Sequence, residues 1–145
     1  HKDDGLLEID VGEMENKLLT DIGKEYPQLA HDWDQAPDLC VFPGGETMEQ
    51  VYRRVQDTIL RIIGENQGKT VAVATHGGFI KNLNAWVEYG SIQGLRKGKV
   101  FGNTSISTLL WEDGKLRWES TDDQSHLPEE LRKAPMQYSF HTEAL

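Results

Sequence analysis

The stretch Val71-Ala72-Val73-Ala74-Thr75-His76-Gly77-Gly78 joins a short apolar run directly to a glycine turn, and it decides the fold class. A short run of consecutive apolar residues is typical of a parallel strand that is buried on both faces. After the turn, apolar residues recur at helical spacing from Phe79 to Val87. The stretch therefore predicts a strand, a tight turn and a helix in succession, which is a building unit of an α/β sheet.

A second helix is predicted just before this strand. Thr47-Met48-Glu49-Gln50 has the pattern of a capping box, in which a threonine hydroxyl and a glutamine side chain satisfy the first free backbone N–H groups. Apolar residues then recur at helical spacing as far as Ile63, and a glycine, Gly64 or Gly68, ends the helix. The opposite, polar face carries Arg53, Arg54, Asp57 and Arg61. The order helix, strand, turn, helix predicts an α/β fold with a mostly parallel sheet flanked by helices.

The rest of the chain gives weaker local signals. Residues 14–24 are predicted as a short helix that Pro27 ends, and residues 28–43 as a loop. Asp113-Gly114 between two apolar runs predicts a β-hairpin. Residues 128–145 are predicted as a short helix and C-terminal tail. With 145 residues, the chain has the length of one ordinary domain, so residues 1–145 are assigned to a single domain.

Composition excludes several classes of function. A net charge of −9 argues against a general nucleic-acid binder, and no apolar run approaches the roughly 20 residues that cross a bilayer. The single cysteine, Cys40, is expected to be a semi-buried loop residue without a catalytic role, and it fits a reducing compartment such as the cytoplasm. The five histidines are scattered without ligand spacing, so neither a metal nor another cofactor is expected.

The turn at His76 is the best candidate for a binding site. Ligands of open α/β sheets bind beyond the carboxyl ends of the strands, and the N-terminus of a helix there offers unpaired N–H groups to a phosphate. Two glycines, Gly77 and Gly78, would let an anion approach the backbone closely, and His76 could donate a hydrogen bond to it. The alternative is a histidine that only caps the helix or packs against it.

Other polar residues offer further candidates. Glu8 follows two leucines, and a carboxyl group with apolar neighbours can serve as a general acid. Glu46 lies either at the rim of a pocket or in a simple turn and cap, and the second interpretation is favoured. A basic group either attracts a phosphate ester or forms a solvated surface; its members are Lys81, Arg96, Lys97 and Lys99.

Taken together in order and spacing, five segments resemble the histidine-phosphatase (phosphoglycerate-mutase-like) superfamily. They are residues 7–15, 43–47, 73–80, 103–106 and 125–127. The resemblance covers about residues 6–127, and Thr75-His76-Gly77-Gly78 is its most specific part. It implies a phosphoglycerate-mutase-like α/β sheet flanked by helices and a reaction that needs no metal.

The resemblance also implies roles for individual residues. Members of the superfamily use a histidine in an Arg-His-Gly motif to attack the phosphoryl group, which forms a phosphohistidine. Glu8 occupies the position of the carboxylate that protonates the leaving oxygen, and His76 matches a second histidine that holds the phosphoryl group. The backbone N–H of Gly77 would point at the same phosphate, and Asn103 would lie near the pocket.

The sequence departs from the superfamily at its beginning. It contains no Arg-His-Gly, and the second phosphate-binding arginine expected before Glu8 is also absent. The chain starts with His1 rather than methionine. About the first third of the expected enzyme, including a central strand, is missing. We therefore expect a truncated, cleaved or partial chain that is inactive by itself and incomplete at its N-terminus.

Phosphomonoester hydrolysis is the leading functional hypothesis, with a small phosphorylated metabolite as the substrate. Glu8 and His76 lie 68 positions apart (76 − 8), and the glycolytic mutase branch usually has extra sequence there, which favours a phosphatase. The alternatives are a phosphoglycerate-mutase-type phosphoryl transfer, a non-catalytic relative that binds a phosphate ligand, and an unrelated α/β domain. The sequence does not predict the oligomeric state.

Overall fold

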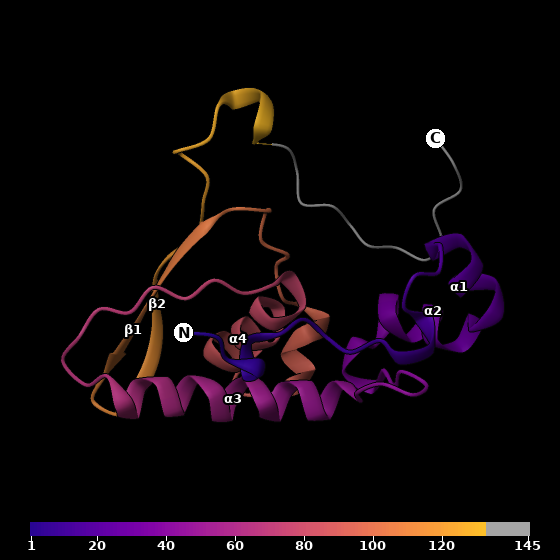
Figure 1. The fold of residues 1–145 in the computed structure, drawn as a ribbon, viewed down its shortest axis with the longest axis horizontal. Helices are drawn as coiled ribbons and strands as arrows, with labels where there is room; N and C mark the ends of the chain where they lie inside the picture. Colours follow the sequence, from indigo (N-terminus) through magenta and orange to yellow (C-terminus); the bar gives the residue numbers. More distant parts are fainter. Residues whose placement is uncertain (133–145) are drawn as a thin grey trace.

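A computed structural model describes residues 1–132 of the chain, which form helices and one β-hairpin. The α-helices and strands are α1 (Leu19–Glu25), α2 (Pro27–Gln35), α3 (Met48–Glu65), α4 (Gly77–Tyr89), β1 (Ile106–Glu112) and β2 (Lys115–Asp123). Short 3-10 helices cover Asp4–Leu6, Gly12–Met14, Pro37–Leu39, Ile92–Arg96 and Glu129–Leu131. Helix α3 runs along one side of the molecule, with α4 and the N-terminal segment against its middle, α1 and α2 at one end and the hairpin at the other (Figure 1).

Helix α3 begins where the sequence predicted. The Gln50 N–H donates to Thr47 Oγ1 at 3.1 Å, and the Thr47 N–H donates to Gln50 Oε1 at 2.7 Å, so both bonds of the capping box form. The predicted apolar face is buried and packs against α4. Burial of each large aliphatic side chain stabilises the fold by about 1.5–3 kcal/mol. The buried residues of α3 are Met48, Val51, Tyr52, Val55, Thr58 and Ile59.

Helix α2 replaces the first part of the loop that was predicted at residues 28–43. Pro27 is the first residue of α2, a position where a missing N–H breaks no hydrogen bond of the helix. It therefore follows the end of α1 and also begins α2. The prediction of a loop over residues 28–43 is therefore wrong for α2. The predicted helix at 14–24 is confirmed only in its second half, because α1 begins at Leu19. Leu29 and Ala30 fix α2 in the core.

The predicted hairpin is confirmed. Glu112 pairs with Lys115 and Trp111 with Leu116, so Asp113 and Gly114 form a two-residue turn. Both turn residues have positive φ, 51° and 75°, as a type I′ turn requires. The Trp118 indole N–H donates to Asn84 Oδ1 at 3.0 Å and fastens the hairpin to α4.

Residues 71–74 do not form the predicted buried strand. They follow α3 as an extended segment, and Val71 and Val73 are 45% and 41% exposed. A strand obtains both its hydrogen bonds and its burial from neighbouring strands, and no segment within residues 1–132 pairs with this one. The only sheet in the described part of the chain is the antiparallel pair β1–β2, so the mostly parallel sheet is not confirmed.

Cys40 is more deeply buried than the sequence suggested, with 1% of its surface exposed. Burial raises the pKa of the thiol to about 12, and the negative charge of Asp32 adds to this effect. A thiol with such a pKa stays protonated near neutral pH, and the thiolate is the nucleophilic form. Cys40 is therefore a core residue and not a catalytic one.

A buried ion pair joins two of the 3-10 helices. The Arg96 guanidinium donates two hydrogen bonds to the Asp38 carboxylate, at 2.6 and 2.9 Å, and the Asp38 side chain is only 2% exposed. The Arg96 hydrogen bonds hold the pKa of Asp38 below its usual value. Arg96 therefore has a structural partner, which tells against the expectation that it attracts a phosphate ester.

Arg96→Met should lower the free energy of unfolding by about 1–2 kcal/mol at pH 7, because it leaves the buried Asp38 carboxylate without its partner. The loss is smaller than for a fully buried pair, since the Arg96 side chain is 44% exposed and partly screened by solvent. A carboxyl group with a depressed pKa contributes stability above its unfolded pKa of about 3.9, and this contribution is lost as the pH falls through the folded value. The difference between wild type and variant should therefore shrink at acidic pH. Urea unfolding at pH 7 and below pH 4 measures both quantities.

Arg117→Met is the matched control for this prediction. Arg117 pairs with Glu112 on the hairpin, and both side chains are more than half exposed. An exposed pair contributes about 0–1 kcal/mol. Equal losses in the two variants, or a loss in Arg96→Met that does not depend on pH, would contradict the role assigned to the buried pair.

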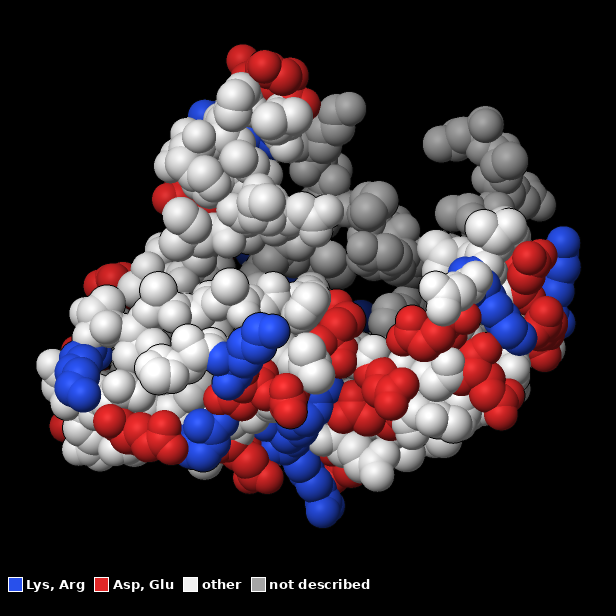
Figure 2. All heavy atoms as spheres, viewed as in Figure 1, with Lys and Arg blue, Asp and Glu red and all other residues white. Residues whose placement is uncertain are grey.

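Acidic side chains dominate the surface in keeping with the net charge of −9. On the face shown in Figure 2 they gather over α1 and α2 and alternate with lysine and arginine along α3, without a continuous basic stripe. Within residues 1–132, no helix is both long enough and apolar enough to span a bilayer. The absence of nucleic-acid binding remains a prediction.

Candidate active site at the start of helix α4

His76 lies at the N-cap of α4, in an extended backbone conformation. Its side chain is exposed and makes no capping hydrogen bond, so it is not a histidine that caps or packs. The imidazole is therefore available to a ligand. The first N–H groups of α4 have no partner within the helix and carry a partial positive charge, which favours an anion at this position.

Glu8 reaches the same helix start from the other end of the chain. The Gly78 N–H donates to Glu8 Oε2 at 3.1 Å, and the Ile9 N–H donates to Glu8 Oε1 at 3.0 Å. The structure thus brings together the carboxylate and the histidine turn that the sequence singled out separately. The apolar surroundings expected for Glu8 are not present in the described residues, because Glu8 is exposed and Leu7 is 55% exposed.

The two glycines of the turn meet different surroundings. A Cβ at Gly78 would overlap the Glu8 carboxylate and lie 2.7 Å from Ile9 Cδ1, so a larger residue here would displace these two side chains. A Cβ at Gly77 would meet no atom within 4 Å. The space in front of the Gly77 backbone is therefore open to a ligand.

Backbone hydrogen bonds hold the segment that carries Glu8. The Glu46 N–H donates to the Asp10 carbonyl at 2.9 Å, and the Glu13 N–H donates to the Pro43 carbonyl at 2.8 Å. The Thr75 hydroxyl donates to the Leu6 carbonyl at 2.7 Å. The turn at residues 43–46 therefore does more than precede a helix, because it fixes the chain on one side of Glu8.

Glu46 contributes its side chain as well. Its carboxylate accepts the Asp10 N–H at 3.0 Å and pairs with Arg54, a residue that the sequence analysis placed on the polar face of α3. Burial raises the pKa of Glu46, but the Arg54 hydrogen bonds and the Asp10 N–H outweigh it, so the pKa lies below its usual value. The sequence analysis did not predict this pair, because no local pattern marks it.

No hydrogen bond within residues 1–132 joins the remaining predicted residues to Glu8 or His76, and the role of Asn103 stays a prediction. Asn103 lies in an exposed turn before β1 and makes no hydrogen bond to Glu8 or His76. The Lys81 ammonium lies 5.4 Å from the centre of the Trp33 ring, and burial lowers the pKa of Lys81. No cluster of three or more potential metal ligands occurs in residues 1–132.

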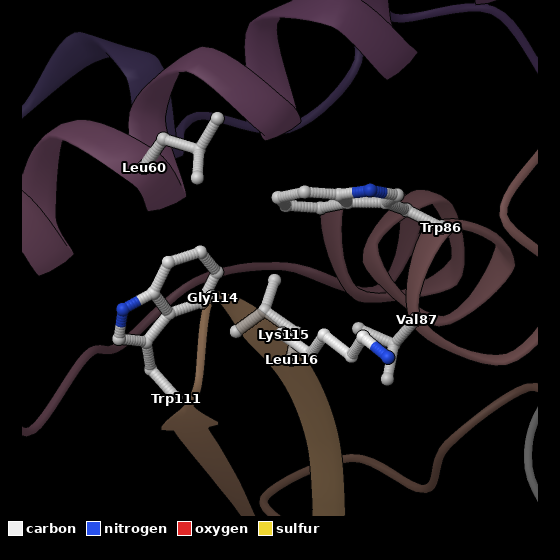
Figure 3. A pocket seen from close by; sticks show the side chains of 7 residues that line it. All are labelled: Leu60, Trp86, Val87, Trp111, Gly114, Lys115 and Leu116. Atoms are coloured by element: carbon white, nitrogen blue, oxygen red, sulfur yellow. The ribbon is translucent and has the colours of Figure 1, made fainter.

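A separate hollow of about 380 Å³ lies between α3, α4 and the hairpin. Figure 3 shows the side chains of Leu60, Trp86 and Trp111 converging around it. Its lining includes no carboxylate and no histidine, and neither Glu8 nor His76 borders it. The hollow therefore lacks the carboxylate and histidine side chains that lie at the start of α4.

The sequence profile of the histidine phosphatase superfamily, branch 1, matches residues 1–124. The chain belongs to this superfamily. The match includes Glu8, His76, Gly77 and Asn103, and the resemblance stated from the sequence motifs is confirmed.

Several curated proteins are similar to this superfamily member. Phosphoserine phosphatase 1 of Hydrogenobacter thermophilus is 31% identical over 75 residues, which are 52% of this chain and 36% of the relative. Phosphoglycerate mutase-like protein 4 of Arabidopsis thaliana is 28% identical over 129 residues, which are 88% of this chain and 54% of the relative. The chain thus spans between about a third and a half of the length of these relatives.

Solved structures show the same fold. YhfR of Bacillus stearothermophilus superposes with a TM-score of 0.80 at 27% identity, over 86% of this chain and 62% of its own. A phosphoserine phosphatase mutant of Entamoeba histolytica, in complex with phosphoserine, superposes with a TM-score of 0.70 at 22% identity, over 88% of this chain and 64% of its own. The described helices and hairpin are therefore arranged as in the histidine phosphatase fold.

Proposed function

We propose that the complete protein is a phosphomonoester hydrolase that acts on a small phosphorylated metabolite through a phosphohistidine intermediate. One observation carries this proposal: Glu8 Oε2 accepts the Gly78 N–H at 3.1 Å, in the first turn of the helix whose N-cap is the exposed His76. Phosphate-ester cleavage uses an acid that protonates the leaving oxygen. It also uses hydrogen-bond donors to the phosphoryl oxygens, here a histidine and unpaired N–H groups at a helix start.

Each part has a proposed step. A histidine nitrogen attacks phosphorus, and the bond from phosphorus to the ester oxygen breaks. Protonated Glu8 gives its proton to that oxygen, while His76 and the Gly77 N–H donate hydrogen bonds to the phosphoryl oxygens. Water then attacks the phosphorus of the phosphohistidine, the bond from phosphorus to the histidine nitrogen breaks, and the Glu8 carboxylate accepts a proton from the water. This sequence of steps returns Glu8 to its protonated form and releases inorganic phosphate.

The attacking histidine is proposed to lie outside the 145 residues. The sequence has no Arg-His-Gly, and within the described residues His31 lies on α2, where it contacts Asp32 rather than Glu8 or His76. We therefore propose that the chain is inactive by itself and that turnover requires the nucleophile from the complete protein. The relatives named phosphoserine phosphatase support hydrolysis as the reaction.

Phosphate release by the protein expressed from its complete gene tests this function. Phosphoserine, p-nitrophenyl phosphate and 3-phosphoglycerate are suitable substrates, and the 145-residue chain is assayed beside it. Hydrolysis by the complete protein, but not by the 145-residue chain, supports the proposal. Isomerisation of 3-phosphoglycerate with negligible hydrolysis would favour the mutase alternative, and phosphate binding without turnover would favour a non-catalytic relative.

A further inference from the structure

Arg54 makes an unusual set of contacts for a residue on the polar face of a helix. Its Nη1 donates to the carbonyls of Gly5 and Leu7, both at 2.9 Å, and its Nη2 donates to the carbonyl of Glu8 at 3.3 Å. Its Nε and Nη2 also bind the Glu46 carboxylate, each at 2.8 Å. The side chain is only 21% exposed. One guanidinium therefore donates hydrogen bonds to three carbonyls of the segment that carries Glu8.

Glu46 completes this arrangement from the other side. One of its carboxylate oxygens, Oε2, accepts both an Arg54 hydrogen bond and the Asp10 N–H. The Arg54–Glu46 pair thus holds backbone groups before Glu8, at Glu8 and after it. A lysine could not replace Arg54, because only the planar guanidinium presents several donors in a fixed fork.

The position of the Glu8 side chain depends on this backbone. Within residues 1–132, its carboxylate is bound by two N–H groups, those of Ile9 and Gly78, and it is otherwise exposed. The Thr75 hydroxyl at Leu6 and the turn at residues 43–46 also hold the backbone of this segment. If the segment moved, the carboxylate would leave the start of the helix, and a displacement of about 1 Å can cost about a hundredfold in rate.

We propose that Arg54, together with Glu46, is a positioning residue that keeps the Glu8 carboxyl at the first turn of α4. The kinetic consequence rests on the proposed function, in which Glu8 protonates the leaving oxygen. Loss of Arg54 should therefore impair proton delivery more than substrate binding. The impairment should be greatest for esters whose leaving oxygen needs a proton.

The kinetic test compares Arg54→Met with Arg53→Met in the complete protein. Arg53 is the adjacent residue on α3, is 72% exposed and binds only Glu49, so it is a matched control. Phosphoserine has a poor leaving group, the serine oxygen. For this ester, kcat of Arg54→Met should fall about tenfold or more, with KM unchanged. p-Nitrophenyl phosphate has a good leaving group, p-nitrophenolate. For this ester, kcat of Arg54→Met should fall no more than about threefold. Arg53→Met should match wild type for both.

Equal losses of kcat for the two esters, or no loss at all, would overturn the proposal. Circular dichroism shows whether Arg54→Met is folded; if it is not, Arg54→Lys replaces it with the same expected pattern, because lysine keeps the charge without the fork. A full recovery of kcat by Arg54→Lys would also overturn the proposal.

Amide NMR separates this inference from the proposed function. In the complete protein, the Gly78 amide proton should change its chemical shift in Arg54→Met, because its hydrogen bond to Glu8 is lost, and should keep it in Arg53→Met. If wild type hydrolyses neither ester, the proposed function fails, and the Gly78 signal alone decides about Arg54. A Gly78 signal that does not move would overturn the positioning role.

Discussion

Replacing His76 with alanine should lower kcat of the complete protein by about a hundredfold or more, which is the scale of losing one preorganised group that stabilises the transition state. The His76 side chain is exposed and makes no hydrogen bond in the described structure, so its removal costs no buried contact. The free energy of unfolding should stay within about 0.5 kcal/mol of wild type. Steady-state phosphate release and urea unfolding measure the two quantities.

A histidine elsewhere on the surface serves as the control. His31 lies on α2, is exposed and contacts the neighbouring Asp32 at 3.2 Å. His31→Ala removes the same side chain and should leave kcat and KM unchanged. Unchanged turnover in His76→Ala would remove His76 from the mechanism, and the match of its turn to the superfamily would then reflect the fold alone.

Features that depend on nearby residues could be predicted from the sequence. The capping box at Thr47 and Gln50 contains both partners of its two hydrogen bonds within four residues, and α3 begins as expected. The turn at Asp113 and Gly114 likewise specifies its own backbone conformation. The same holds for the helix that follows Gly77, because its apolar spacing is a local property.

Features that depend on distant partners could not be predicted in this way. The apolar run at residues 71–74 predicts a buried strand only if other strands cover it, and within residues 1–132 none does. Pro27 was read as the end of one helix, although the same ring also suits the first position of the next.

The candidate site also combines residues that could be predicted from local sequence with contacts that could not. Glu8 and His76 were singled out from their local sequence and given roles by the resemblance of their motifs, whereas the hydrogen bond that brings Glu8 to the start of α4 depends on the fold. Arg54 was assigned to a solvent face because its helical position is polar, yet the carbonyls that bind it belong to residues 5, 7 and 8. A contact between residues almost 50 positions apart leaves no local pattern in a single sequence.

Glu8→Gln should separate the acid from the rest of the site. Glutamine has the shape of glutamate, and its single amide oxygen can still accept the Gly78 N–H, although the hydrogen bond from the Ile9 N–H is then lost. The Arg54 contacts to the backbone remain, so the segment should keep its position. It cannot deliver a proton, and general acid catalysis contributes about 10²–10⁴ in rate. For phosphoserine, kcat should therefore fall by at least about a hundredfold. For p-nitrophenyl phosphate, the loss should be much smaller, because its leaving oxygen departs without a proton.

The leaving-group comparison also distinguishes the chemistry of Glu8 from its charge. If the carboxylate acted only through its charge at the start of α4, both esters would lose rate to the same extent, since the phosphoryl group is common to them. Equal losses would thus contradict the acid role while leaving Glu8 in the site. A selective loss for phosphoserine, with the Gly78 amide still hydrogen-bonded, would show that the proton on Glu8 is what the leaving oxygen requires.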